Sequence, residues 1–159
     1  MTVGRPGDIL RPVATWGAFA RAEPDLAAFG SELFGKAPAY IATIRDDGAP
    51  RVHPVTPILT ADELFVFMEP TSPKGRDLRE RGRFAMHNGV PDGSGTGGEF
   101  WLFGRAQPVA DAARRAKAAD AASYDPADRY VLFELLVEEA RCNGYGDVPL
   151  PEHRRWRSA

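Results

Sequence analysis

The sequence has few of the residues from which disulfides, metal sites and membrane spans are built. Its 159 residues include a single cysteine, Cys142, which excludes an internal disulfide and a multi-thiolate zinc site within one chain. The three histidines are far apart and lack metal-ligand spacing. No long uncharged apolar run occurs, and residues 1–12 contain no signal-like apolar stretch. We therefore expect a soluble, cytoplasmic protein without a metal site.

The sequence also lacks an excess of charge of either sign. Twenty Lys and Arg residues face 22 Asp and Glu residues, which gives a formal net charge of −2. No global positive field is available to hold nucleic acid or an anionic membrane, so neither is an expected partner. Hydrophobic residues make up 43% of the chain and charged residues 26%, so a core can form. The length predicts one domain.

The hydrophobic pattern changes along the chain from helical to strand-like. Apolar residues recur at helical spacing between about residues 16 and 35, and Pro24 divides them into two helices. Pro54 and Pro57 place a later strand at a sheet edge or a bulge, because proline cannot donate a ladder hydrogen bond. Six segments predict strands: Ala39–Arg45, Arg51–Leu59, Glu63–Glu69, Arg83–Asn88, Glu99–Val109 and Tyr130–Ala140.

Six strands joined largely by short turns predict a mainly β, α+β domain with the helices packed outside a small antiparallel barrel. We divide the chain into an N-terminal helical arm (residues 1–36), the barrel (37–140) and a C-terminal tail (141–159). Two further helices are expected, one from Pro73 to about Arg81 with Ser72 as its N-cap, and one over Asp111–Ala122.

The start of the helix at Pro73 is a candidate anion site. A helix N-terminus exposes unpaired backbone N–H groups and a partial positive charge, and Ser72 and Lys74 add a hydroxyl and an ammonium group. Arg51 begins a neighbouring strand and could contact the same anion. The alternative is that Ser72 only caps the helix and that the cations, including Arg81, lie on a solvated face.

Other motifs point less clearly to a chemistry. The glycine-rich loop from Gly89 to Gly98 precedes a strand and lacks the ending of a phosphate-binding loop. Trp156, flanked by arginines, could stack on a planar ring, anchor the tail on the barrel or bind RNA. No nucleophile elbow or other recognisable nucleophile motif is present. If the protein is an enzyme, a bound cofactor is expected to supply the chemistry.

The stretch Ala39–Asn88, AYIATIRDDGAPRVHPVTPILTADELFVFMEPTSPKGRDLRERGRFAMHN, resembles the FMN-binding split β-barrel superfamily. This superfamily includes pyridoxamine 5′-phosphate oxidase and flavin- and deazaflavin-dependent oxidoreductases. The shared order is strand, Asp-Gly turn, Arg-bearing strand, strand, and a Ser-x-Lys helix start followed by Asp-Leu and another strand. The match continues loosely through Phe100–Val109 and Tyr130–Ala140.

The resemblance implies a six-stranded antiparallel split barrel with peripheral helices, working as a homodimer with FMN at the subunit interface. It implies that Arg51, Lys74 and Ser72 hold the flavin phosphate. The other cofactor-binding residues that it implies are Val52 and His53 on the Arg-bearing strand, Met68 and Glu69 at the end of the next strand, and Glu99 and Trp156. Glu99 would come from the second subunit, and Trp156 would close the site.

The implied function is hydride transfer to or from a small organic substrate, with no catalytic protein residue assigned. Two departures set the chain apart from the oxidase itself: Pro73-Lys74 replaces an Arg-Lys pair, and Thr56 replaces a basic residue. A deazaflavin coenzyme is an alternative cofactor. A non-catalytic flavin- or haem-binding protein is a further alternative, with His53 or His87 as the axial haem ligand.

Overall fold

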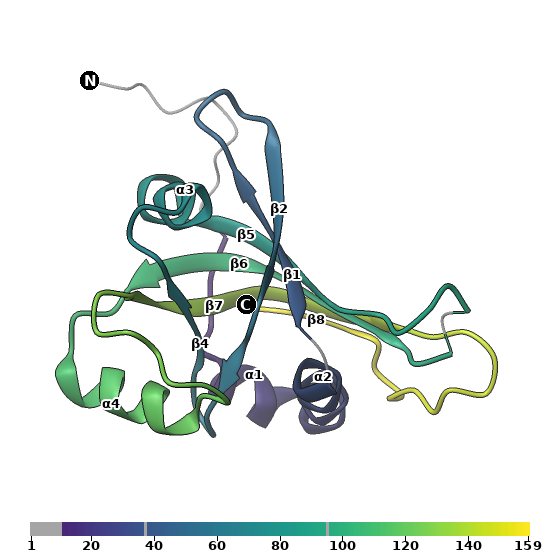
Figure 1. Ribbon diagram of the computed structural model, residues 1–159. Helices are drawn as coiled ribbons and strands as arrows, with labels where there is room; N and C mark the ends of the chain where they lie inside the picture. The colour runs from purple at the N-terminus through teal and green to yellow at the C-terminus, as the bar shows by residue number, and fades with distance from the viewer. Residues whose placement is uncertain (1–10, 37, 95) are drawn as a thin grey trace.

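The computed structural model describes residues 11–36, 38–94 and 96–159, which form an antiparallel sheet curled into a half-barrel with helices around it (Figure 1). The helices in these ranges are α1 Trp16–Ala22, α2 Pro24–Lys36, α3 Pro73–Arg81 and α4 Ala112–Ala121. The strands are β1 Ala39–Ile44, β2 Pro50–Val55, β3 Ile58–Leu59, β4 Leu64–Met68, β5 Arg83–Asn88, β6 Glu99–Pro108, β7 Val131–Asn143 and β8 Arg155–Arg157. The sheet order is β2-β1-β5-β6-β7-β4-β3, with β8 paired to β7. The predicted fold class is confirmed.

The helices begin where their capping residues predict. The Ser72 hydroxyl accepts a hydrogen bond from the Gly75 amide, and the Asp111 carboxylate accepts one from the Arg114 amide. Pro24 is the first residue of α2, where its missing N–H costs nothing. Figure 1 shows α3 at the opposite end of the barrel from α1 and α2. No helix in the described ranges has the length and apolar character to cross a membrane.

The expected count of six strands is wrong, because the described residues contain eight. The predicted strand Arg51–Leu59 breaks at residues 56–57 into β2 and the short β3. β2 lies at the sheet edge, as its prolines predict, and β3 pairs with β4 instead. The tail adds β8, which pairs with β7 from Glu139 to Arg141. The strand expected to end at Ala140 continues to Asn143, because its last residues also pair with β6.

The main core lies between the concave side of the sheet and the first two helices. Phe100 on β6 is fully buried, and its ring packs edge-on against Trp16 and Phe34. It also stacks on Phe19 at a centroid distance of 6.5 Å. Leu78 of α3 belongs to the same apolar cluster. The core thus fixes α3 against the sheet, which determines the position of the candidate site.

Gly104 marks a register shift between β6 and β7, and we expect its replacement by alanine to destabilise the fold. A Cβ atom at Gly104 would lie 1.8 Å from the carbonyl oxygen of Leu136, which belongs to backbone and cannot rotate away. Overpacking of this kind costs about 1–3 kcal/mol. Gly104→Ala should lower the free energy of unfolding in urea by an amount near the top of this range. Gly35→Ala is the control, since a Cβ there meets nothing within 4 Å; an equal loss in both variants would contradict the prediction.

Candidate functional site

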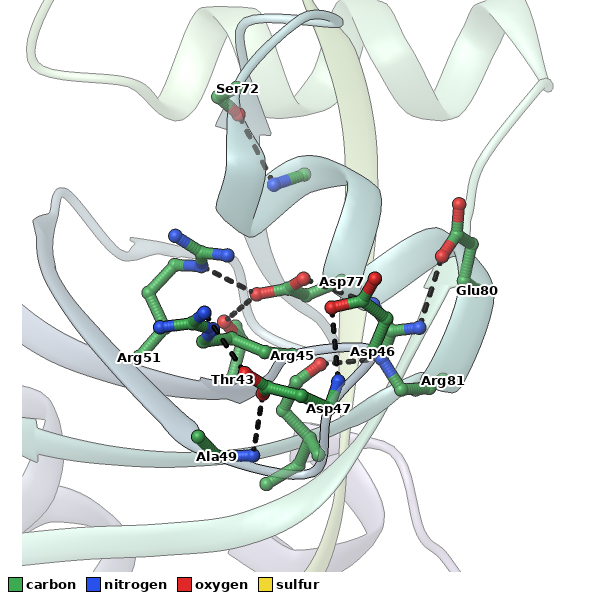
Figure 2. Close-up of polar contacts among 12 residues, drawn as sticks. Thr43, Arg45, Asp46, Asp47, Ala49, Arg51, Ser72, Asp77, Glu80 and Arg81 are labelled. Carbon is green, nitrogen blue, oxygen red and sulfur yellow. Dashed lines mark hydrogen bonds and ion pairs between the residues drawn. The ribbon is translucent and has the colours of Figure 1, made fainter.

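A buried carboxylate, Asp77, connects the Arg-bearing strand to helix α3. Asp77 is 3% exposed, and its Oδ2 accepts hydrogen bonds from the Thr43 hydroxyl at 2.7 Å and from Arg51 Nε at 2.8 Å. Its Oδ1 accepts a hydrogen bond from Arg81 Nη2 at 3.0 Å. Figure 2 shows Arg51 and Arg81 reaching Asp77 from opposite sides. We call these four residues, Thr43, Arg51, Asp77 and Arg81, the Asp77 cluster.

The local sequence explains how the Asp77 cluster forms. Thr43 on β1 and Arg51 on β2 are paired in the antiparallel ladder, so their side chains lie on the same face of the sheet. Asp77 and Leu78 are the buried side chains of α3, so this face of the helix packs on the sheet. Arg81 is one turn after Asp77 and also donates to the Ile44 carbonyl. A solvated face, which we considered for the cations of this helix, is wrong for Arg81.

The electrostatics of the cluster keep Asp77 ionised. Burial alone would raise the pKa of Asp77, but hydrogen bonds from Thr43, Arg51 and Arg81 and the charge of Arg51 hold that pKa below its ordinary value. A buried carboxylate is stable only with such partners. The arginines are therefore held in place by a charge that does not titrate near neutral pH.

Arg51 and Lys74 lie on elements that the Asp77 cluster holds together. The Arg51 side chain is 27% exposed, and its Nη1 and Nη2 have no hydrogen-bond partner among the described residues. Lys74 precedes Asp77 by three positions on α3, so the two side chains emerge on neighbouring positions of the same helix face. The Lys74 ammonium has no ion-pair partner in the described part of the chain either.

The backbone at the start of α3 has fewer unpaired N–H groups for an anion than the sequence predicts. The Gly75 amide is bonded to the Ser72 hydroxyl, and the Arg76 amide to the Ser72 carbonyl. Pro73 has no N–H to offer. Within the described residues only the Lys74 amide remains without a partner in the first turn. The Ser72 hydroxyl, which accepts from Gly75, keeps its own hydrogen available for donation. An anion at this place would depend mainly on side chains.

The remaining predicted cofactor-binding residues lie in different surroundings. Val52 is 61% exposed on the outer face of the sheet, whereas His53 lies on the inner face beside Arg51 and has no hydrogen-bond partner among the described residues. Met68 is buried in the core, and Glu69 pairs with the exposed Arg129 at 3.0 Å.

The two residues predicted to reach the cofactor from elsewhere are also engaged within the chain. Glu99 Oε1 lies 3.2 Å from Nε2 of His87, whose Nδ1 contacts the Asn88 carbonyl. Trp156 packs against Phe19 at a centroid distance of 5.1 Å, partly buried against the core. Trp156 therefore anchors the C-terminal tail on the barrel, which is one of the roles that its sequence predicts.

The outer face of strands β2, β1, β5 and β6 carries an apolar concavity. Its volume is about 430 Å³. The lining residues are Tyr40, Ala42, Val52, Ala85, Met86, His87, Glu99 and Trp101. His87 stacks on Trp101 with ring centroids 5.9 Å apart. Tyr40 and Val52 on this face are large, apolar and exposed. An apolar patch of this kind is typical of a surface that contacts another molecule.

Sequence reasoning missed Asp77 and Thr43 as members of the site. Neither residue carries a local signal of this role, because the two are 34 residues apart and the charges along α3 do not show which side chain is buried. No group of three or more His, Cys, Asp or Glu residues that could hold a metal is present in the described ranges.

Known proteins of similar structure share this barrel. No family profile matches the chain, and no curated protein matches it significantly in sequence. A NimC/NimA family protein from Clostridium acetobutylicum has a TM-score of 0.64 at 14% identity, over 84% of this chain and 93% of that one.

Two further structures extend the comparison. A general stress protein 26-related protein of the pyridoxinephosphate oxidase family, also from C. acetobutylicum, has a TM-score of 0.59 at 9% identity, over 77% of this chain and 89% of that one. A haem-binding protein from Mycobacterium smegmatis has a TM-score of 0.59 at 24% identity, over 87% of this chain and 57% of that one. The chain therefore has the split-barrel fold of the pyridoxamine 5′-phosphate oxidase-like proteins, as its sequence predicts.

Proposed function

We propose that this chain binds the phosphate of FMN through Arg51 and Lys74 and works as a flavin-dependent oxidoreductase of the pyridoxamine 5′-phosphate oxidase-like kind. The observation that carries the proposal is the Arg51 guanidinium, which is held against α3 by Asp77 while its two terminal nitrogens have no partner among the described residues. A planar fork with two free N–H groups suits a phosphate.

The start of α3 would add further donors for a phosphate monoester. Lys74 supplies a second positive charge and a free backbone amide, and Ser72 supplies a hydroxyl hydrogen. Arg51 and Arg81 are offset by their partners Asp77 and Glu80, and Lys74 leaves a net local charge of +1. This positive charge would favour a phosphate anion. Riboflavin, which lacks the phosphate, would gain nothing from these groups.

The rest of the proposed site positions the flavin ring. Val52 and His53 would lie along the isoalloxazine or the ribityl chain, and the backbone of Met68 and Glu69 would meet the ribityl or phosphate region. When bound, the isoalloxazine would supply hydride transfer to or from a small organic substrate. The chain's own residues bind and orient the cofactor, and we assign no protein acid or base.

We further propose that the outer face is the contact between two copies of this chain. The concavity beside Tyr40 and Val52 is apolar, and a second copy would remove these exposed side chains from water. Glu99 lines the same concavity, and we expect it to approach the cofactor of the second copy. Trp156, from the tail strand β8, would close that site.

Absorbance and titration of the purified protein test the proposal. Bound FMN should give a flavin spectrum that NAD(P)H or another reductant bleaches, and FMN should bind more tightly than riboflavin. Affinity for a deazaflavin coenzyme without affinity for FMN would mean that the cofactor is a deazaflavin, and the proposed phosphate site would be retained. Equal affinity for FMN and riboflavin would overturn the proposed anion site.

Haem binding is the second candidate function, because one structural neighbour is a haem-binding protein and His53 has no hydrogen-bond partner among the described residues. His87 fits an axial ligand less well, since both of its ring nitrogens have partners. A Soret band on haem addition that disappears in His53→Ala but persists in His87→Ala would favour this function over flavin chemistry.

A further inference from the structure

We infer that Asp77 is a positioning residue for the cofactor phosphate: it occupies Nε of Arg51 and so turns the two terminal nitrogens of that arginine toward the anion. The inference rests on the proposed FMN site and adds to it a residue that does not itself touch the cofactor. It also concerns a negative charge, which at first sight should weaken anion binding.

The geometry of the guanidinium determines how Arg51 can bind. An unrestrained arginine can meet a phosphate either through Nε and one terminal nitrogen or through both terminal nitrogens. Asp77 Oδ2 lies 2.8 Å from Arg51 Nε, so the first mode is blocked. Only the end-on fork of Nη1 and Nη2 remains available. Asp77 thereby selects one mode of binding before the ligand arrives.

The position of the carboxylate is itself fixed from several directions. Asp77 is 3% exposed, and Thr43 donates to the same oxygen that Arg51 contacts. Arg81 donates to the other oxygen from the opposite side and is tied to the Ile44 carbonyl. Asp77 therefore cannot follow Arg51 if the arginine swings outward. A side chain that loses less rotational freedom on binding gives a tighter complex.

Asp77 has two opposite effects on phosphate binding, and an experiment can tell which of them is larger. Its negative charge offsets one arginine, so charge alone predicts that removing it strengthens phosphate binding. Its hold on Nε orients the fork, so positioning predicts that removing it weakens phosphate binding. We assign the larger effect to positioning, because the Arg51 side chain is 27% exposed and would sample several rotamers without its bond to Asp77.

The test compares FMN with riboflavin in Asp77→Asn, which keeps the volume of the side chain and removes its charge. We expect the preference for FMN over riboflavin to fall by about tenfold or more, as loss of an oriented charged hydrogen bond predicts. Riboflavin binding should be retained, which also shows that the variant is folded. A stronger preference for FMN would mean that charge dominates, and equal weakening of both ligands would mean a purely structural role; either result overturns the inference.

Two further variants separate positioning from charge and from folding. Asp77→Glu keeps the charge but moves the carboxylate by one methylene, so the FMN preference should fall here as well. Asp111→Ala is the control: it removes the cap of α4, a helix with no residue in the Asp77 cluster, so it should lower stability without changing the preference. An unchanged preference in Asp77→Glu, with riboflavin binding intact, would contradict the inference.

A double-mutant cycle with Arg51→Ala completes the experiment. Without Arg51 there is no fork to orient, so adding Asp77→Asn should cause no further loss of FMN preference. Additive losses would show that Asp77 acts by another route. If the wild-type chain itself shows no preference for FMN, the proposed function fails; if it shows one that the Asp77 variants retain, the positioning role alone fails.

Discussion

Replacing both Arg51 and Lys74 by alanine should abolish most of the preference for FMN over riboflavin while leaving riboflavin binding nearly unchanged. A hydrogen bond to a charged group contributes about 1.5–3 kcal/mol, so the loss of two such partners predicts a fall in FMN affinity of about 100-fold to 10,000-fold. Neither cation contacts the neutral flavin ring in the proposed site, which is why riboflavin is the internal reference.

Fluorescence titration of each ligand with each variant measures this effect. Arg79→Ala is the control, because Arg79 is an exposed cation on the same helix but lies away from its buried face. It should leave the ratio of affinities unchanged. The effect should also shrink as salt concentration rises, since it depends on charge. Equal losses for FMN and riboflavin in the double variant would show that the phosphate binds elsewhere.

The free energy of unfolding should fall as the pH is lowered, because several buried carboxylates are held ionised in the folded protein. Burial would raise the pKa of Glu139, but Arg141 and Arg157 lower it below its ordinary value, and hydrogen bonds to Asp77 do the same there. A lowered folded-state pKa contributes stability above the unfolded-state pKa and loses it as the pH falls through the folded value. The contribution of these carboxylates to the free energy of unfolding should therefore decline below about pH 4.

Urea unfolding at several pH values measures this dependence. Asp77→Asn should show a shallower decline than the wild-type chain, because one of the linked carboxylates is gone. His87→Ala is the control, since it leaves these carboxylates unchanged. An acid profile in Asp77→Asn as steep as that of the wild-type chain would show that Asp77 makes no linked contribution.

Local signals in the sequence account for much of the fold. Ser72 and Pro73 fix the start of α3 through hydrogen bonding and backbone geometry that involve only adjacent residues. The edge position of β2 follows from Pro54, which cannot serve an inner strand. These features are local, so they can be predicted without knowledge of the tertiary structure.

The features that sequence reasoning missed depend on distant pairing. β8 has three residues, pairs with β7, and is tied to it by hydrogen bonds from Arg155 and Arg157 to Glu139. Asp77 is separated from Thr43 by 34 residues and from Arg51 by 26. Whether a charged side chain is solvated or buried in an ion pair is decided by such contacts, so the charge pattern of α3 alone could not reveal the Asp77 cluster.

Introducing a charge on the outer face should separate the two proposed copies. Tyr40 is 49% exposed in the isolated chain and lines the apolar concavity, so Tyr40→Asp should fold but bury an unpaired carboxylate in a dimer. A twofold axis doubles the substitution, and each buried unpaired charge costs several kcal/mol. The dimer dissociation constant should rise by about a thousandfold or more.

Analytical ultracentrifugation over a range of concentrations measures the change in assembly. Tyr145→Asp is the matched control, because Tyr145 is 54% exposed but is not part of the concavity. A dimer that survives Tyr40→Asp would place the contact on another face.

The same variant also distinguishes the subunit contact from the anion site by its effect on ligand binding. Since Glu99 and Trp156 are proposed to complete the site of the second copy, Tyr40→Asp should weaken the binding of FMN and of riboflavin together. The Arg51 and Lys74 variants should weaken FMN binding and leave the dimer intact. The two sets of variants thus distinguish the anion site from the subunit contact.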